Sequence, residues 1–264
     1  MNKYLNIPLS KRQKFVVSVA MLSVGIFISQ YITGVYSIFS ALFLSLLTVL
    51  FLFISLQEDI KDNFSYTIFI LPFMFTLSLI LFYPLLPARL LTRIIITGLY
   101  AFGLYSIFLT QNIFAVSAIR TINLLRSARI VSFILTIAII FFSANIIFSS
   151  RLPFYISPLI IGFLIFIMNV QSLWTYSLNK EFLHEAVFLS VLIALCLAEI
   201  AAVLNIWPIN AAIYSIVISG VFYAYSGLTH VWVEKRLFRN VLWEYVWVGL
   251  LAILILIIFS KWGI

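Results

Sequence analysis

The sequence predicts an all-α membrane protein built as a bundle of transmembrane helices. Of its 264 residues, 64% are hydrophobic and 9% are charged, whereas a soluble domain averages about 45–50% apolar and about 25% charged residues. Its mean hydropathy is +1.20. The apolar residues form continuous runs of roughly 20 residues, which is the length that a helix needs to cross a hydrocarbon core of about 30 Å. These observations, together with a single cysteine in the chain, exclude soluble, disordered and disulfide-stabilised folds.

Nine apolar runs follow one another along the chain, separated by charged or turn residues. They are expected near 15–33, 36–56, 66–86, 91–113, 129–149, 154–174, 184–206, 209–227 and 241–260. Tilted outer-membrane strands are excluded because they would alternate in hydrophobicity over about 10 residues. The sequence therefore predicts nine spans in a single integral membrane domain, residues 1–264. Eight spans is the alternative, if the 113–130 connection or one of the short hairpins behaves differently.

Glycine and proline mark the shortest connections between these spans. Gly34 lies between the first two spans and Pro208 between the seventh and eighth, and both residue types end helices for backbone reasons. Pro72 falls inside the third span, where we expect a kink.

Lysine and arginine predict the orientation, because cationic loops are retained in the cytoplasm. With the N-terminus inside, the inner segments carry Lys3, Lys11, Arg12, Lys14, Lys61, Arg120, Arg126, Arg129, Lys180, Lys235, Arg236 and Arg239. The outer ends carry Arg89, Arg93, Arg151 and Lys261. We therefore expect the N-terminus inside and the C-terminus outside, in a cytoplasmic membrane of the bacterial inner-membrane type.

A short tripeptide recurs at or just after the outer turns, and it hints at an internal repeat. Its copies begin at Ile32, Ile96, Ile160 and Ile218, and each ends in glycine. Four helical hairpins followed by a terminal helix would fit this pattern, and internal repeats are common in transporters.

Glu199 lies firmly inside the seventh predicted span. A carboxylate at such depth must be paired, protonated or hydrated. Glu185 falls within about 40° of it on the same helical face. Two interpretations stay open for Glu199. It is either a functional carboxylate that binds a proton or cation or acts as a general acid, or a structural partner for Arg93, Arg151 or Asn210.

The eighth span carries a polar stripe formed by Ser215, Ser219, Tyr223, Ser226 and His230. Their spacing of four, four, three and four residues places them on one helical face. We interpret the stripe as a packing surface, because small residues at this spacing let helices approach closely. The alternative is a hydrated groove that leads to His230.

Arg89, Arg93 and Arg151 on the predicted outer side have no acidic residue in an outer loop to pair with. They could bind a phosphate or an anionic head group, or pair with Glu199. No ligand spacing predicts a metal site and no glycine-rich motif predicts a nucleotide, so neither a metal nor a cofactor is expected. Binding of nucleic acid is not expected either, because no soluble domain carries a basic face.

Residues 181–247 include Glu185, Ala198-Glu199, Trp207-Pro208, Phe222-Tyr223, Gly227-Leu228 and Glu244-Tyr245. In these features the chain loosely resembles uncharacterised multi-pass membrane proteins of uncultured bacterial lineages. The resemblance implies a polytopic helical fold and no particular activity.

Three functions are compatible with these features. The spans contain few polar residues, and contacts between helices can explain them. This favours a non-enzymatic accessory or scaffold module that recognises the lipid bilayer, other membrane subunits or an anionic lipid. A small secondary transporter that uses an intramembrane carboxylate is one alternative. The other is a membrane-embedded lipid-modifying enzyme that uses Glu199 or His230 with the outer arginines.

Overall fold

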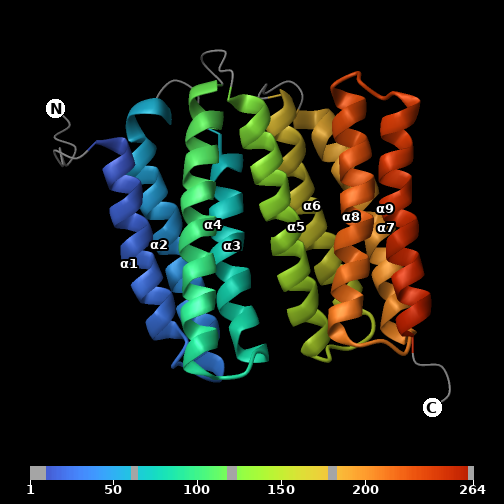
Figure 1. Ribbon diagram of the computed structural model, residues 1–264, viewed down its shortest axis with the longest axis horizontal. Coiled ribbons are helices and arrows are strands. Elements are labelled where there is room, and N and C mark those ends of the chain that lie inside the picture. The colour runs from blue at the N-terminus through green and yellow to red at the C-terminus, as the bar shows by residue number, and fades with distance from the viewer. Residues whose placement is uncertain (1–9, 61–64, 118–123, 178–182, 261–264) are drawn as a thin grey trace.

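The computed structural model of the chain describes residues 10–60, 65–117, 124–177 and 183–260 (Figure 1). This part of the chain contains nine α-helices, one 3₁₀ turn and no strand. The elements are α1 (Lys11–Ser29), α2 (Val35–Ile60), α3 (Thr67–Phe82), η1 (Tyr83–Leu85), α4 (Leu90–Ser117), α5 (Leu125–Ser149), α6 (Ile156–Ser177), α7 (Leu183–Ile206), α8 (Ala211–Val233) and α9 (Arg239–Phe259). Nine helices, with η1 extending the third, are long and apolar enough to cross a membrane. The predicted nine-span helical bundle is confirmed.

Local sequence signals explain several helix boundaries. Ser10 and Gln13 form a capping box at the start of α1, which begins earlier than the apolar run alone predicts. Asn210 caps α8 by accepting a hydrogen bond from the backbone N–H of Ile213 at 2.9 Å. Gly34 adopts a φ of 72° in the turn between α1 and α2, a conformation that glycine adopts without steric cost. Pro72 lies inside α3, where the Thr76 hydroxyl donates to its carbonyl oxygen.

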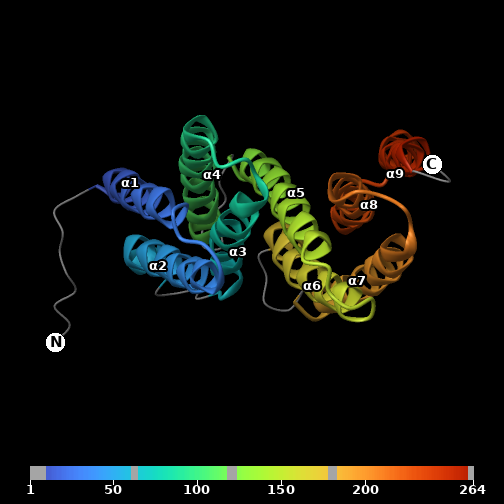
Figure 2. The ribbon, with the colours of Figure 1, turned by 90° about the horizontal axis from the view of Figure 1, so that it is seen from below.

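The helices form two units of four, to which α9 is added (Figure 2). In the first unit α1 contacts α2 and α4, α2 contacts α3 and α4, and α3 contacts α4. The same pairings recur in the second unit, in which α5, α6, α7 and α8 take the corresponding places. Contacts of α3 with α5 and α6, and of α4 with α5, join the two units. The four copies of the tripeptide do not occupy equivalent positions in the two units. Gly34 lies in a turn, whereas the glycines of the other three copies lie within helices.

Buried hydroxyl groups connect helices inside the first unit. The hydroxyl of Thr48 on α2 lies 3.1 Å from that of Thr76 on α3, and Thr76 lies 3.2 Å from the hydroxyl of Tyr100 on α4. All three side chains are fully buried. Because a hydrocarbon environment offers no water to satisfy these groups, their mutual hydrogen bonds hold the three helices together.

The described part of the chain crosses the bundle nine times. Because this number is odd, the start of α1 and the end of α9 lie at opposite ends of the bundle (Figure 1). The orientation of the bundle relative to the cytoplasm stays a prediction from the distribution of lysine and arginine.

Candidate functional site

The polar stripe of α8 faces the interior of the second unit. Ser215, Ser219, Ser226 and His230 are buried, with between 0% and 7% of their surface exposed. Tyr223 is half-buried and stacks against Phe133 of α5. The hydroxyl groups of Ser215 and Ser219 donate to carbonyl oxygens one turn earlier in their own helix. The arrangement agrees with a packing surface.

A chain of buried side chains, the His230 network, runs from α7 through α6 to the stripe. Asn169 of α6 donates to the hydroxyl of Ser190 on α7 at 3.0 Å. Ser226 donates to the Asn169 side-chain carbonyl at 2.7 Å. The Nε2 atom of His230 lies 3.0 Å from the hydroxyl of Ser172 and 3.4 Å from that of Ser226. The network therefore joins α6, α7 and α8, and each of its polar side chains has a hydrogen-bond partner.

Aromatic rings enclose the imidazole of His230. The ring of Tyr176 stacks on it at a centroid distance of 4.2 Å, and Phe133 meets it edge-on at 4.8 Å. The side chain of His230 is 2% exposed. A hydroxyl beside an imidazole is the pairing used for nucleophilic catalysis, but here the pair is enclosed by protein. The geometry supports a structural role for His230, as a junction between α8 and its neighbours α5 and α6.

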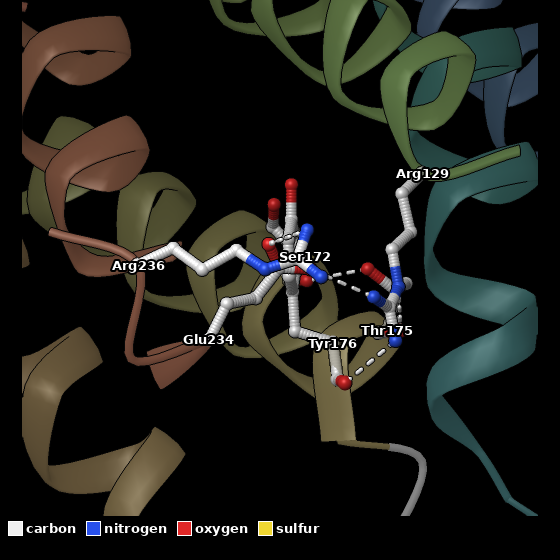
Figure 3. Close-up of polar contacts among 6 residues, drawn as sticks. All are labelled: Arg129, Ser172, Thr175, Tyr176, Glu234 and Arg236. Carbon is white, nitrogen blue, oxygen red and sulfur yellow. Dashed lines mark hydrogen bonds and ion pairs between the residues drawn. The ribbon is translucent and has the colours of Figure 1, made fainter. Parts of the chain in front are cut away.

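The Arg129 cluster lies beside this junction, where α6 ends (Figure 3). Arg129 of α5 donates to the carbonyl oxygens of Thr175 and Tyr176 at 3.0 and 2.7 Å. These carbonyl groups belong to the last turn of α6, which has no intrahelical donors for them. A guanidinium also matches the partial negative charge at a helix C-terminus. Arg129 thus caps α6 from a neighbouring helix.

Glu234 completes the cluster from the end of α8. Its carboxylate lies 2.9 Å from the Arg129 guanidinium, and its second oxygen lies 3.9 Å from Arg236. The Arg129 and Glu234 side chains are 16% and 28% exposed, so water screens their attraction only in part. The cluster fixes the ends of α5, α6 and α8 relative to one another.

Glu199 lies elsewhere, in an apolar groove between α7, α8 and α9 that we call the Glu199 groove. The groove has a volume of about 460 Å³, and its walls include Val203, Val221, Ile253 and Leu256. Glu199 is exposed and makes no ion pair or hydrogen bond with the described residues. Glu185 occupies the first turn of the same helix, about 21 Å further along the axis at 1.5 Å per residue. The two carboxylates therefore do not form one site.

The predicted outer arginines lie in different surroundings. Arg93 donates to the hydroxyl of Tyr83 at 3.0 Å, and its guanidinium lies 3.7 Å from the ring centroid of Tyr31. Arg89 is exposed in the turn before α4. Arg151 lines a separate pocket at the ends of the helices of the second unit. None of the three pairs with Glu199.

Sequence reasoning missed the contribution of α6. Asn169, Ser172, Thr175 and Tyr176 all take part in the His230 network or the Arg129 cluster. Their spacing of three, three and one residues places them along one helical face. The same periodicity that revealed the stripe on α8 could have identified the side chains of this second face, but not the backbone carbonyl groups of Thr175 and Tyr176 that Arg129 caps. Within the described residues, no group of three or more His, Cys, Asp or Glu side chains could hold a metal ion.

Comparison with known proteins identifies one family. The family model described as "Protein of unknown function (DUF5656)" matches residues 57–259, which include the His230 network, the Arg129 cluster, the Glu199 groove and the pocket that Arg151 lines. No curated protein and no solved structure matches the chain.

Proposed function

The chain belongs to the DUF5656 family of proteins of unknown function, and we propose that it is a non-enzymatic accessory module that binds a transmembrane helix of a partner protein. The Glu199 groove is the proposed binding site. The partner helix would carry a lysine or arginine that pairs with Glu199. We further propose the bacterial cytoplasmic membrane as its location, from the cationic bias of the predicted inner segments.

The unpaired carboxylate of Glu199 carries the proposal. It lies seven residues before the end of α7, about 10 Å from that helix end at 1.5 Å per residue. An ionised carboxylate at such a depth costs several kcal/mol unless a cation or a hydrogen-bond donor compensates it. This chain supplies no such partner from its described residues. A cationic side chain on another helix would supply one.

The placement of α9 supports a helical partner. Small residues bring α9 close to α8, because a Cβ atom built on Gly220 would lie 3.1 Å from the Cβ atom of Ala252. Ala252 is the single buried residue of α9, and the helix packs mainly against α8 (Figure 2). The remaining space between α7 and α9 is the aliphatic groove that Glu199 enters. A transmembrane helix matches both its apolar walls and its single charge.

The other candidate residues support a non-enzymatic function. Ser226 and His230, which could have served an enzyme, are engaged in hydrogen bonds between helices. Glu199 lines the groove, whereas Arg151 lines a different pocket, so the proposed combination of this carboxylate with an outer arginine has no common cavity. A lipid-modifying enzyme would need at least three polar groups that converge on one reaction centre.

A small secondary transporter is the second function that Glu199 favours, because an unpaired carboxylate can carry a coupled proton. Transporter sites are typically formed by helices that break near the middle of the membrane. Helix α7 is continuous through Glu199, and the groove is lined largely by aliphatic side chains. The geometry therefore supports the accessory module better.

Site-specific crosslinking in native membranes tests the proposal. A photoreactive amino acid replaces Val203, which lies in the groove and is 56% exposed, or Phe102, a control on α4 that is 76% exposed. We expect a protein adduct from position 203 and none from position 102. Glu199→Gln should remove most of the adduct, because the substitution preserves shape and removes the charge. Reversing both charges, Glu199→Lys together with the partner's cation to glutamate, should restore it.

Three outcomes would overturn the proposal. Adducts with lipid alone would mean that the groove faces the bilayer. An adduct of twice the mass of this chain would identify a second copy as the occupant. An adduct of unchanged yield in Glu199→Gln would show that binding of any partner helix does not depend on the carboxylate. Proton-coupled uptake into reconstituted vesicles that Glu199→Gln abolishes would favour the transporter instead.

A further inference from the structure

A second cavity, the Arg151 pocket, lies at the end of the bundle where α5 and α7 finish and α6 and α8 begin. Its volume is about 620 Å³, within the range of about 300–1,000 Å³ that is usual for small-molecule sites. Polar groups line it from three segments: Arg151 after α5, Ser157 at the start of α6, and Asn205 and Asn210 at the two sides of the turn between α7 and α8. The Glu199 groove is a separate cavity, so binding in the Arg151 pocket would be independent of the proposed function.

The electrostatic character of the pocket is positive. Arg151 is its one formal charge, and no carboxylate is among its lining residues. Helices α6 and α8 both begin at the pocket, contributing Ser157 and Ala211 to its wall. Each helix N-terminus adds a partial positive charge, although the N–H groups of Ile156 and Ser157 on α6 already donate to the carbonyl oxygen of Pro153. Two such termini beside an arginine favour an anion.

Unpartnered polar atoms in the wall indicate that a ligand belongs there. Ser157 is 3% exposed, and its hydroxyl lies beside that of Tyr214 without a well-formed hydrogen bond to it or to any other described group. The side-chain nitrogen of Asn205 is likewise buried and unpaired. Leaving such groups unsatisfied costs about 1–3 kcal/mol each. A ligand that accepts hydrogen bonds would satisfy Ser157 and Asn205, because a hydroxyl and an amide nitrogen can each donate.

The backbone at Arg151 adds a further argument. Arg151 directly follows the cap of α5 and has a φ of 47°, in the left-handed region where glycine is strongly preferred after a helix. An arginine in this conformation is held at a conformational cost of about 1 kcal/mol or more. At that cost the side chain of Arg151 places a cation in the wall of the pocket.

From these observations we infer that the Arg151 pocket binds the phosphate group of an anionic molecule. Arg151 supplies the charge, Ser157 and Asn205 donate hydrogen bonds, and the partial positive charges at the starts of α6 and α8 attract the phosphate oxygens. Phe148, Leu152 and Phe154 form apolar parts of the wall, which suit the adjoining hydrocarbon of an amphiphile. A phospholipid head group and a free phosphate share the chemistry that this site recognises.

Direct binding measurements test the inference on the full-length protein in detergent. The probes are phosphatidylglycerol, phosphatidylcholine with the same acyl chains, and inorganic phosphate. Native mass spectrometry measures lipid binding and calorimetry measures phosphate binding. Hydrogen exchange locates the site, and we expect slower exchange at the first turns of α6 and α8. Phosphatidylglycerol should bind more tightly than phosphatidylcholine, whose head group has no net charge.

Arg151→Gly is the decisive variant, because glycine suits the observed φ and keeps the backbone. Loss of the charge-assisted hydrogen bonds should weaken binding by about tenfold or more. Lys235→Gly is the matched control: Lys235 follows the cap of α8 with a φ of 57° and does not line the pocket. This control should bind as the wild type does. Ser157→Ala removes one donor and should weaken binding several-fold.

Each result identifies the ligand source or overturns the inference. Arg151-dependent binding of phosphatidylglycerol but not of inorganic phosphate assigns a lipid head group, and the reverse result assigns a soluble phosphate. The inference fails if neither probe binds, or if phosphatidylcholine binds equally well. It fails equally if Arg151→Gly has no effect, or if Lys235→Gly weakens binding as much as Arg151→Gly does.

Discussion

The guanidinium of Arg129 lies 2.9 Å from the carboxylate of Glu234, although 105 residues separate them along the chain. Arg129 simultaneously donates to two carbonyl groups in the last turn of α6. One side chain of α5 thus holds the ends of two other helices. Because both the ion pair and the cap depend on it, its removal leaves a carboxylate and two carbonyl groups without their donor.

We therefore expect Arg129→Ala to lower the free energy of unfolding by about 1–3 kcal/mol, the typical cost of losing hydrogen bonds to a charged donor. Thermal unfolding of the purified protein in detergent measures the change. Arg126→Ala removes an exposed arginine one turn earlier in α5 and is the control. Equal effects of the two substitutions would contradict a special role for Arg129.

Asn169 connects two serine side chains in the His230 network, so their energies should be coupled. Ser190→Ala and Ser226→Ala should each lower the free energy of unfolding by about 0.5–2 kcal/mol, the range measured for interhelical hydrogen bonds in membranes. The double variant should lose less than the sum, because losing either serine frees the Asn169 side chain and weakens its remaining hydrogen bond to the other. A double-mutant cycle from urea or thermal unfolding measures the coupling. Strictly additive losses would mean that the two hydrogen bonds are independent, which would contradict the predicted coupling.

Gly227 permits the close approach of Tyr245 on α9. A Cβ atom built on Gly227 would overlap a ring carbon of Tyr245, closer than real Cβ contacts allow. Gly227→Ala should therefore displace the ring and reduce stability by about 1–3 kcal/mol, as measured by thermal unfolding in detergent. Tyr245→Ala should make the same glycine substitution tolerable. Gly98→Ala is the control, since nothing lies within 4 Å of the added Cβ atom, and alanine there should be neutral or stabilising.

The charge distribution predicts that the C-terminus is outside the cytoplasm. A phosphatase reporter that is active only outside should therefore give a signal when fused after Ile264, and none when fused after Lys235. Labelling of Ser150→Cys by an impermeant thiol reagent in intact cells should agree, after the lone native cysteine, Cys196, is changed to serine. A cytoplasmic signal after Ile264 would contradict the predicted orientation.

The helices could be predicted from the sequence because the thickness of the membrane imposes a length on every apolar run. The bounds were less predictable where polar residues continue a helix. Helix α8 extends to Val233, beyond the apolar run that ends near 227, because Ser226 and His230 continue its buried stripe. Capping at Ser10 similarly starts α1 before its apolar run.

The contacts of the polar residues were harder to predict, because hydropathy does not reveal which helix faces meet. Arg93 was a reasonable partner for Glu199 from the sequence, but Tyr83 and Tyr31 of its own unit surround it. Arg129 looked like one of many cations that determine orientation, yet it caps α6. Both outcomes depend on the packing of helices that are distant in sequence. The stripe of α8 was predictable because its periodicity belongs to one helix.

The matching helix pairings of α1–α4 and α5–α8 have a consequence for the origin of this fold. A unit with an even number of crossings returns the chain to the side on which it began. Tandem duplication of an ancestral four-helix gene segment would therefore insert its second copy in the same direction as the first, without any reversal of topogenic signals. Helix α9 is the single crossing outside this symmetry, and its addition or loss would move the C-terminus from one compartment to the other.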